Sequence, residues 1–186
     1  MKFLDNYFKD LGNLLALNDK LMDQLIQCNH LFKKTDSKNG KVIIMGNGGS
    51  AAMSSHVTVD LTKNSKIRAI NFNEADLITC FSNDYGYENW MKEALRFYSD
   101  RNDLVVLVSS SGSSANVVKA AKWSLENKLP VITFTGMDKN NPLKSINKAG
   151  LNFWVDSKAY NHIEMVHHIW LLAVVDMIIG NSIYKA

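Results

Sequence analysis

This chain of 186 residues has only two cysteines, Cys28 and Cys80. Each lies in an apolar, periodic segment, and neither has a second cysteine nearby with which it could form a metal knuckle. The sequence therefore excludes a cysteine-based zinc module. It predicts two buried thiols in a reducing compartment.

The chain also lacks a large excess of charge and any long uninterrupted apolar run. Its formal net charge is +3, and the lysines are scattered instead of clustered along one segment. A scattered charge of this size does not form a track for a phosphate backbone, so nucleic acid is not an expected partner. Charges interrupt the apolar stretches from the first residues onward, so we expect neither a signal peptide nor a membrane span, and a cytoplasmic protein.

Length and composition predict one folded domain over residues 1–186, since 46% of the residues are hydrophobic and 21% are charged. Apolar residues recur at intervals of three and four from Phe3 to Phe32, which predicts one long amphipathic helix. We assign residues 1–35 to an N-terminal oligomerisation helix, because a small sheet cannot cover its whole apolar stripe. A helical hairpin within one subunit remains the alternative.

Beyond this helix, short apolar runs alternate with helical patterns. The predicted strands are 41–45, 67–72, 104–108, 130–134 and 151–155, and the predicted helices are 50–62, 74–82, 87–98, 114–127, 141–146 and 160–179. This alternation predicts an α/β fold, a three-layer sandwich with a mostly parallel five-stranded sheet and helices on both faces.

Two loops rich in glycine and serine follow two of the predicted strands. The first is Gly46-Asn47-Gly48-Gly49-Ser50 and the second runs from Ser109 to Ser114. Both precede a helix, where backbone N–H groups and hydroxyls can converge on an anion. The alternative is that the serines only cap a helix. Neither loop has the spacing of a Walker or dinucleotide motif, so no nucleotide cofactor is expected.

Three segments carry a resemblance to a known family: 46–50, Asn83-Asp84-Tyr85-Gly86 and 111–117. In this order and spacing they resemble the phosphoheptose isomerase branch of the sugar isomerase (SIS) family. The resemblance implies the SIS fold and conversion of sedoheptulose 7-phosphate to D-glycero-D-manno-heptose 7-phosphate for lipopolysaccharide or capsule. It also implies a cytoplasmic homotetramer with sites at subunit boundaries, and zinc in some members.

Carried over to this sequence, the resemblance implies a set of residues that bind the phosphorylated sugar. Serine hydroxyls would hold the phosphate, Asn47 would line the site and Asp84 would contact the sugar chain. The full candidate set is Asn47, Gly48, Gly49, Ser50, Asp84, Ser109, Ser110, Ser111 and Ser114.

Aldose–ketose isomerisation through an enediol needs a base near two carbons and an acid near two oxygens. His56 and Asp60 share one helical face, and Glu164 and His168 share another, because each pair is four residues apart. His167 points about 100° away from His168 and is the better structural candidate. The predicted catalytic residues are Asp60, Glu164 and His168.

The resemblance places a glutamate base where this chain has Asp60, and an acid histidine near Leu172. We therefore expect the acid role at His168 and the base role at either Asp60 or Glu164. A second hypothesis is a divalent metal site, zinc in particular, built from His56, Asp60, Glu164 and His168. Its alternative is a network of ion pairs, and His56 alone could be an ordinary surface histidine.

Two functions follow from these residues. The first is a phosphosugar isomerase, and the second is a non-catalytic SIS protein that binds a phosphosugar or a partner. A DNA-binding regulator would need an added helix-turn-helix domain, for which the chain has no room. The sequence does not identify the sugar.

Overall fold

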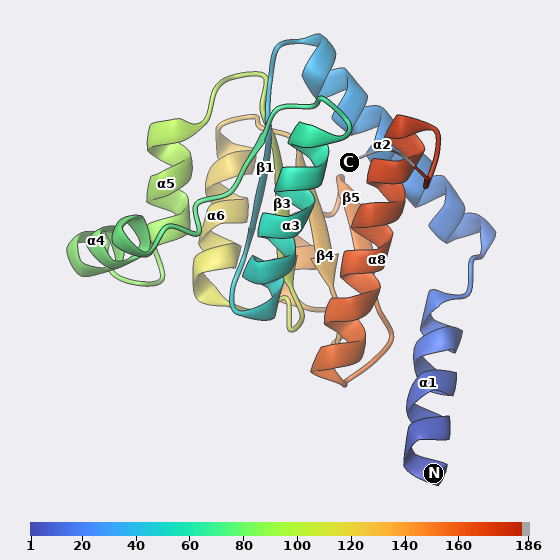
Figure 1. Cartoon of the computed structure of the whole chain (residues 1–186). Coiled ribbons are helices and arrows are strands. Elements are labelled where there is room, and N and C mark those ends of the chain that lie inside the picture. Colours follow the sequence, from blue (N-terminus) through green and yellow to red (C-terminus); the bar gives the residue numbers. More distant parts are fainter. Residues whose placement is uncertain (184–186) are drawn as a thin grey trace.

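The computed structural model describes residues 1–183 and has the predicted alternation of strands and helices (Figure 1). The strands are β1 (Val42–Gly46), β2 (Ala69–Ile70), β3 (Leu104–Ser109), β4 (Val131–Thr135) and β5 (Leu151–Trp154). The helices are α1 (Lys2–Leu15), α2 (Asp19–Ser37), α3 (Gly49–Lys63), α4 (Ala75–Tyr85), α5 (Trp90–Tyr98), α6 (Ala115–Glu126), α7 (Pro142–Ile146) and α8 (Tyr160–Ile179).

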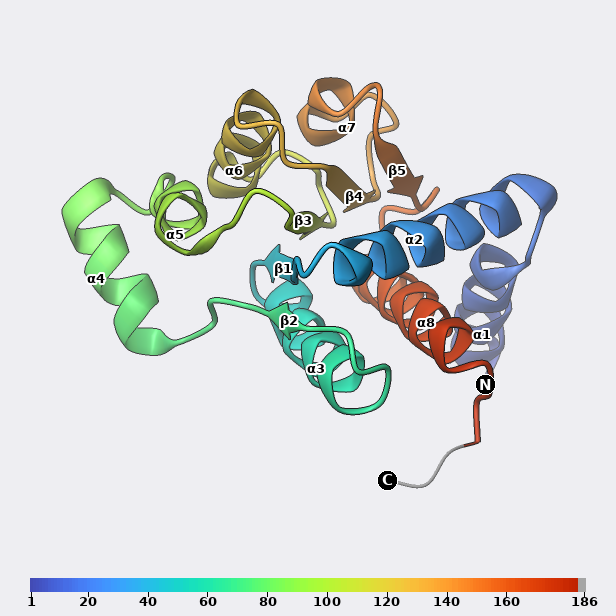
Figure 2. The ribbon, with the colours of Figure 1, turned by 90° about the horizontal axis from the view of Figure 1, so that it is seen from above.

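The five strands form one parallel sheet in the order β2-β1-β3-β4-β5. Figure 2 shows α2, α3 and α8 on one face of this sheet and α5, α6 and α7 on the other. The predicted α/β three-layer fold is therefore confirmed.

Strands β1 and β3 are buried along their whole length, as expected of parallel strands covered on both faces. Their side chains alternate between two cores. Val42 and Ile44 contribute to the core under α2, α3 and α8, whereas Ile43 and Met45 contribute to the core under α5 and α6. This period of two fixes the register of the strand, because a slip of one residue would exchange the two sets.

Three local predictions were wrong. The helix predicted from Phe3 to Phe32 is divided into α1 and α2, because the side chain of Asn18 caps α2 by accepting a hydrogen bond of 3.0 Å from the backbone N–H of Leu21. The strand predicted at 67–72 is reduced to two residues at the sheet edge. Cys28 is buried as predicted, but Cys80 is exposed because α4 has no buried residue.

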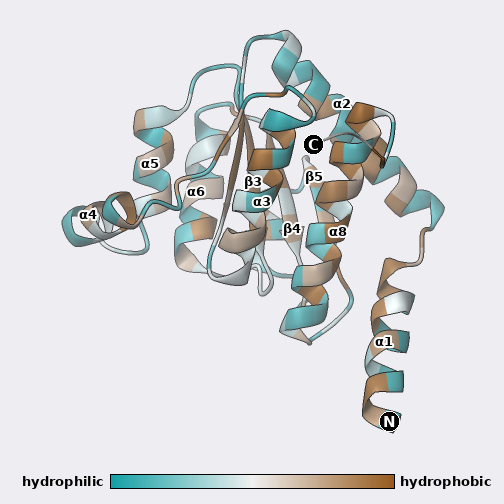
Figure 3. Cartoon of the chain, in the orientation of Figure 1, coloured by the Kyte–Doolittle hydropathy of each residue, from teal (hydrophilic) through white to brown (hydrophobic). Residues whose placement is uncertain are grey.

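Helix α1 lies beside α8 and leaves much of its apolar surface uncovered. The ring of Tyr7 contacts that of His162 at 4.2 Å between centroids. Phe3 is 74% exposed and Phe8 is 66% exposed. Figure 3 shows hydrophobic stretches along α1, which lies away from the sheet.

Helix α8 is long and apolar enough to cross a membrane, judged by length and composition alone. In the structure it is a core helix, since Ile163, Val166, Leu171 and Val174 are fully buried. It packs against α2 and α3, and this packing accounts for its hydropathy.

His167 on α8 is a structural residue, as the sequence predicted. Its side chain is buried between Phe134 and Trp170, and its Nε2–H donates to the carbonyl oxygen of Thr135 at 3.0 Å. Burial lowers the pKa of His167 from 6.5 to about 4, although the bond to Thr135 opposes this shift. The imidazole is therefore neutral in the folded protein at neutral pH.

The buried imidazole predicts a loss of stability in acid. The unfolded chain binds a proton at His167 below pH 6.5, whereas the folded chain does so only near pH 4. The free energy of unfolding should therefore fall by roughly 3 kcal/mol from this group as the pH drops through this window. Urea unfolding of the wild type and of His167→Gln, measured between pH 4 and 7.5, checks this. An equal pH dependence in both proteins would contradict it.

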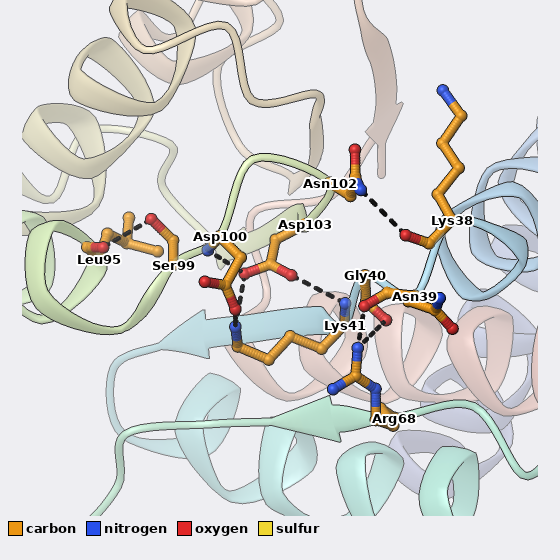
Figure 4. A network of polar contacts seen from close by, with 10 residues as sticks. All are labelled: Lys38, Asn39, Gly40, Lys41, Arg68, Leu95, Ser99, Asp100, Asn102 and Asp103. Atoms are coloured by element: carbon orange, nitrogen blue, oxygen red, sulfur yellow. Dashed lines mark hydrogen bonds and ion pairs between the residues drawn. The ribbon is translucent and has the colours of Figure 1, made fainter.

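Lys41 and Asp103 join the amino ends of β1 and β3 (Figure 4). The Asp103 carboxylate is 1% exposed and accepts hydrogen bonds from Nζ of Lys41 at 2.7 Å, and from the backbone N–H groups of Lys41 at 2.8 Å and Asp100 at 2.6 Å. Partial burial lowers the pKa of Lys41, but its bonds to Asp100 and Asp103 outweigh this effect and raise the pKa above its usual value.

Asp103→Asn should destabilise the fold by about 2–4 kcal/mol, because it leaves a partly buried ammonium without its main carboxylate and weakens two backbone bonds. The matched control is Asp100→Asn. The Asp100 carboxylate also contacts Lys41, at 2.8 Å, but it is 81% exposed, and its loss should change the stability much less because solvent screens the pair. Denaturant unfolding measures both, and equal effects would contradict this account.

Candidate functional site

The two glycine and serine loops meet at the carboxyl edge of the sheet. Strand β1 pairs directly with β3, and Gly46 lies opposite Val108 in the register. The two loops therefore start side by side and enclose a small cavity of about 120 Å³. It is lined by Asn47, Ser50, Val108, Ser109, Ser110, Ser111, Ser114, Tyr160 and Glu164.

The serine loop gathers several hydroxyls, most of which bond to one another or to the loop backbone: Ser109 Oγ lies 3.4 Å from Ser114 Oγ, and Ser111 Oγ accepts from Ser113 Oγ at 3.0 Å. Ser114 is the N-cap residue of α6, yet its side chain makes no capping hydrogen bond. The buried Oγ of Ser110 has no hydrogen-bond partner. The alternative that the serines only cap a helix is therefore not supported at Ser114, and anion binding by the loop stays a prediction.

Gly112 allows this loop to turn. Its φ is +64°, and a Cβ there would lie 2.1 Å from Oδ1 of Asn141. The backbone N–H of Gly112 is directed back to Ser109, whose carbonyl oxygen accepts at 3.0 Å and whose Oγ lies at 3.2 Å. A side chain at position 112 would therefore displace the loop.

The glycine loop brings α3 close to α8. A Cβ on Gly49 would lie 2.2 Å from Oε2 of Glu164, so the glycine makes room for this carboxylate. Helix α3 starts after Gly48 without a side-chain cap. The backbone N–H groups of Ser50 and Ala51 donate instead to the carbonyl oxygens of Asn47 and Gly48, each at 3.0 Å. Gly48 itself, with φ of +55°, is exposed and does not line the cavity.

An amide pair links the two loops. Asn47 donates to Oδ1 of Asn116 at 3.0 Å, and Asn116 donates to Oδ1 of Asn47 at 2.9 Å. The hydroxyl of Tyr87 also donates to Oδ1 of Asn47, at 3.2 Å. These bonds hold Asn47 in one orientation at the cavity wall.

Glu164 and His168 occupy successive turns of α8 on the side that faces α3. Glu164 lines the serine cavity, and His168 lies one turn further along, where its Nε2 is 2.9 Å from Nδ1 of His56. Nε2 of His56 is 3.4 Å from Oδ2 of Asp60, and the other Asp60 oxygen accepts from Asn64 at 3.2 Å. Asp60 and His168 are thus connected through His56, while Glu164 is separate.

The pKa of His168 is lowered, first by partial burial and then by the neighbouring His56, with Asp60 acting in the opposite direction. Lowering favours the neutral imidazole at neutral pH. A neutral imidazole can donate a proton from one nitrogen and accept one at the other.

The four predicted metal ligands are not gathered around one point within the part of this chain that the structure describes. Among residues 1–183, no three His, Cys, Asp or Glu side chains are arranged to hold one. The nitrogens of His56 and His168 face each other at hydrogen-bond distance, and Glu164 lies at the serine cavity. The alternative of a polar network describes His56, Asp60 and His168 better.

Two residues lie elsewhere than the sequence prediction placed them. Asp84 lies on α4 near Cys80 and Asn83 and does not line the cavity formed by this chain. Tyr160, the first residue of α8, does line it and was missed. Its spacing of four residues from Glu164 is the signal that could have revealed it.

Comparison with known proteins agrees with this geometry. Residues 6–136 match the SIS domain family. The phosphoheptose isomerase of Helicobacter pylori is 33% identical over 134 residues, which cover 68% of this chain and 70% of that protein. The one from Colwellia psychrerythraea is 26% identical over 180 residues, 94% of this chain and 92% of that protein.

The solved structure of phosphoheptose isomerase from Neisseria gonorrhoeae superposes with a TM-score of 0.87 at 26% identity, covering 95% of this chain and 98% of that one. The resemblance seen in the loop sequences is thus confirmed along most of the chain. This protein belongs to the SIS domain family.

Proposed function

We propose that this protein is a phosphosugar aldose–ketose isomerase that converts sedoheptulose 7-phosphate to D-glycero-D-manno-heptose 7-phosphate. The observation that carries the proposal is the cavity at the carboxyl edge of the sheet, where a carboxylate, Glu164, shares one enclosure with the serine loop. The relatives named phosphoheptose isomerase support the choice of sugar. The heptose 7-phosphate produced would serve as a precursor of the heptose in lipopolysaccharide or capsule.

The serine loop is suited to the phosphate end of the substrate. Hydroxyls of Ser109, Ser111 and Ser114 surround the start of α6, where backbone N–H groups and the helix dipole favour an anion. Ser50 adds a hydroxyl from the start of α3. These neutral groups would hold the phosphate by hydrogen bonds and without a lysine or arginine. The carboxylate of Glu164 would therefore form no ion pair with a phosphate-binding cation.

Glu164 is the better candidate for the base, because Asp60 does not line the cavity. In the proposed reaction the Glu164 carboxylate removes a proton from C1 of the ketose, and the C1–H electron pair forms the C1–C2 double bond of an enediol. The C2 carbonyl oxygen takes up a proton. Return of a proton to C2, with loss of one from the C1 hydroxyl, gives the aldose.

His168 is the candidate that moves protons at the oxygens. Its lowered pKa favours the neutral imidazole, and its Nε2 faces His56. His168 does not itself line the cavity, but it follows Glu164 by one turn of α8. Asp60 supports this arrangement from the far side of His56. Leu172, where the resemblance places a histidine, packs against the hydrophobic core.

Glu164→Gln should lower solvent deuterium incorporation into sedoheptulose 7-phosphate by about 10²–10⁴-fold, because the amide cannot accept the C1 proton. Asp60→Asn is the matched control, since it also neutralises a carboxylate near the site. It should lower the rate by only about tenfold, through His56 and His168. NMR of the sugar in D₂O measures both.

A larger loss of deuterium incorporation in Asp60→Asn than in Glu164→Gln would assign the base to Asp60. If the wild-type protein incorporates no deuterium into any ketose phosphate tested, the isomerase proposal fails. The non-catalytic reading, a phosphosugar-binding SIS protein, would then be the better one.

We also propose that the protein is a cytoplasmic homo-oligomer, a tetramer, in which the apolar side of α1 is covered by another copy. Phe3, Leu4 and Phe8 are exposed on this helix, and Met165 and Ile169 are exposed on α8. Two neighbouring helices therefore present uncovered hydrophobic side chains, as subunit interfaces do. Asp84, which lies away from the cavity of its own chain, would then be available to a site at a subunit boundary.

Phe8→Asp should shift the protein to a smaller assembly, because it places a charge in the apolar surface of α1. Asn6→Asp adds the same charge on the opposite side of the helix and should leave the mass unchanged. Light scattering coupled to size-exclusion chromatography measures the mass. A wild-type protein that is already monomeric would contradict the proposal.

A further inference from the structure

A second cavity, of about 330 Å³, lies between the start of α2, the loop from β4 to α7 and the end of β5. Figure 2 shows β5 at one edge of the sheet, beside α1 and α2. The residues that line the cavity are Asn13, Leu14, Ala16, Asn18, Lys20, Leu21, Gln24, Lys139, Lys144, Asn152, Trp154, Val155, Asp156 and Trp170. None of them lines the serine cavity.

Three lysines from separate parts of the chain converge on this cavity. Nζ of Lys144 lies 5.6 Å from the centre of the Trp154 ring, and Nζ of Lys139 lies 5.9 Å from it. Lys20 approaches from the first turn of α2. Partial burial lowers the pKa of Lys144, and the charges of Lys139 and Lys20 lower it further, so the three ammonium groups affect one another.

The lysines are poorly balanced by acidic groups. Asp156 is the one acidic side chain that lines the cavity. Among residues 1–183, no ion pair within 4.0 Å involves Lys20, Lys139 or Lys144. Lys20 also lies in the first turn of α2, at the positive end of the helix dipole, where Asp19 is the acidic residue of that turn.

The wall of the cavity combines aromatic surface with unused hydrogen-bond donors. Trp154 and Trp170 both line it, and the indole N–H group of each lacks an acceptor. Trp170 is 7% exposed, so its N–H is not satisfied by bulk water. Buried donors without partners are uncommon in folded proteins and mark places where a ligand can supply an acceptor.

We propose that this cavity is a second binding site, for a small phosphate monoester. Three cations opposed by one carboxylate leave an excess of two positive charges, which a phosphate dianion matches. Lysine binds phosphate as a point charge, and the indole faces suit the carbon skeleton attached to it. The volume lies in the range of small-molecule sites. The site does not depend on the isomerase activity.

Fluorine NMR of the full-length protein labelled with 5-fluorotryptophan tests this proposal. The chain has four tryptophans, so single Trp→Phe variants assign the four signals. Sedoheptulose 7-phosphate, added at constant ionic strength, should shift the Trp154 signal saturably. Inorganic phosphate should do so only at higher concentration, because it lacks the carbon skeleton.

Lys144→Gln and Lys139→Gln should each weaken this binding by roughly tenfold, because each removes one charge–phosphate contact. Lys148→Gln, an exposed lysine outside the cavity, is the matched control and should have no effect. Unchanged signals from Trp90 and Trp123 report that the variants are folded.

Ser111→Ala distinguishes the two cavities, since it should leave the Trp154 shift intact. Loss of that shift in Ser111→Ala, with retention in Lys144→Gln, would overturn the proposal and assign the response to the serine loop. Absence of a saturable shift would overturn it as well. Failure of the deuterium exchange experiment would leave this result unaffected, so the two proposals can fail separately.

Discussion

The direct parallel pairing of β1 with β3 is the constraint on which the site depends. Because Gly46 lies opposite Val108, the glycine loop and the serine loop leave the sheet next to each other. In an open parallel sheet, ligands bind at the carboxyl ends of the strands where the strand order reverses. Here the order reverses at β1, since β2 lies on one side of it and β3 on the other. The Lys41–Asp103 pair fixes the same two strands at their other end.

Most of the fold could be predicted from the sequence, because the elements that matter carry strong local signals. β1 and β3 are short runs of buried aliphatic residues, and α8 ends at Gly180, whose φ of +83° is the left-handed conformation of a helix C-cap. The break between α1 and α2 was missed because the apolar spacing continues across it. Asn18, a good N-cap residue, was the local signal for it.

Only those features of the site that lie within a single loop or helix could be predicted from the sequence. Each of the two loops is a continuous stretch of sequence, so the prediction that it binds an anion could be made there. The relation of Glu164 to His168 was visible as a spacing of four, and the choice of His168 over His167 followed from helix geometry. What could not be predicted is how α3 and α8 pack. That packing places Glu164 against Gly49 and His168 against His56, so that Glu164 lies apart from the other three residues proposed as metal ligands.

The departures of this chain from the pattern that its loops resemble form one consistent arrangement. A leucine at 172 joins the hydrophobic core, so proton transfer cannot occur at that turn of α8. The charged and imidazole groups lie instead on the two preceding turns, nearer to the serine loop. Glu164 needs the space that Gly49 provides, and His168 needs the support of His56 and Asp60. Partly buried polar groups lower the stability of the fold unless they are paired or serve a function. The retention of Glu164 against Gly49, and of His168 against His56, therefore argues against a site that has lost its function.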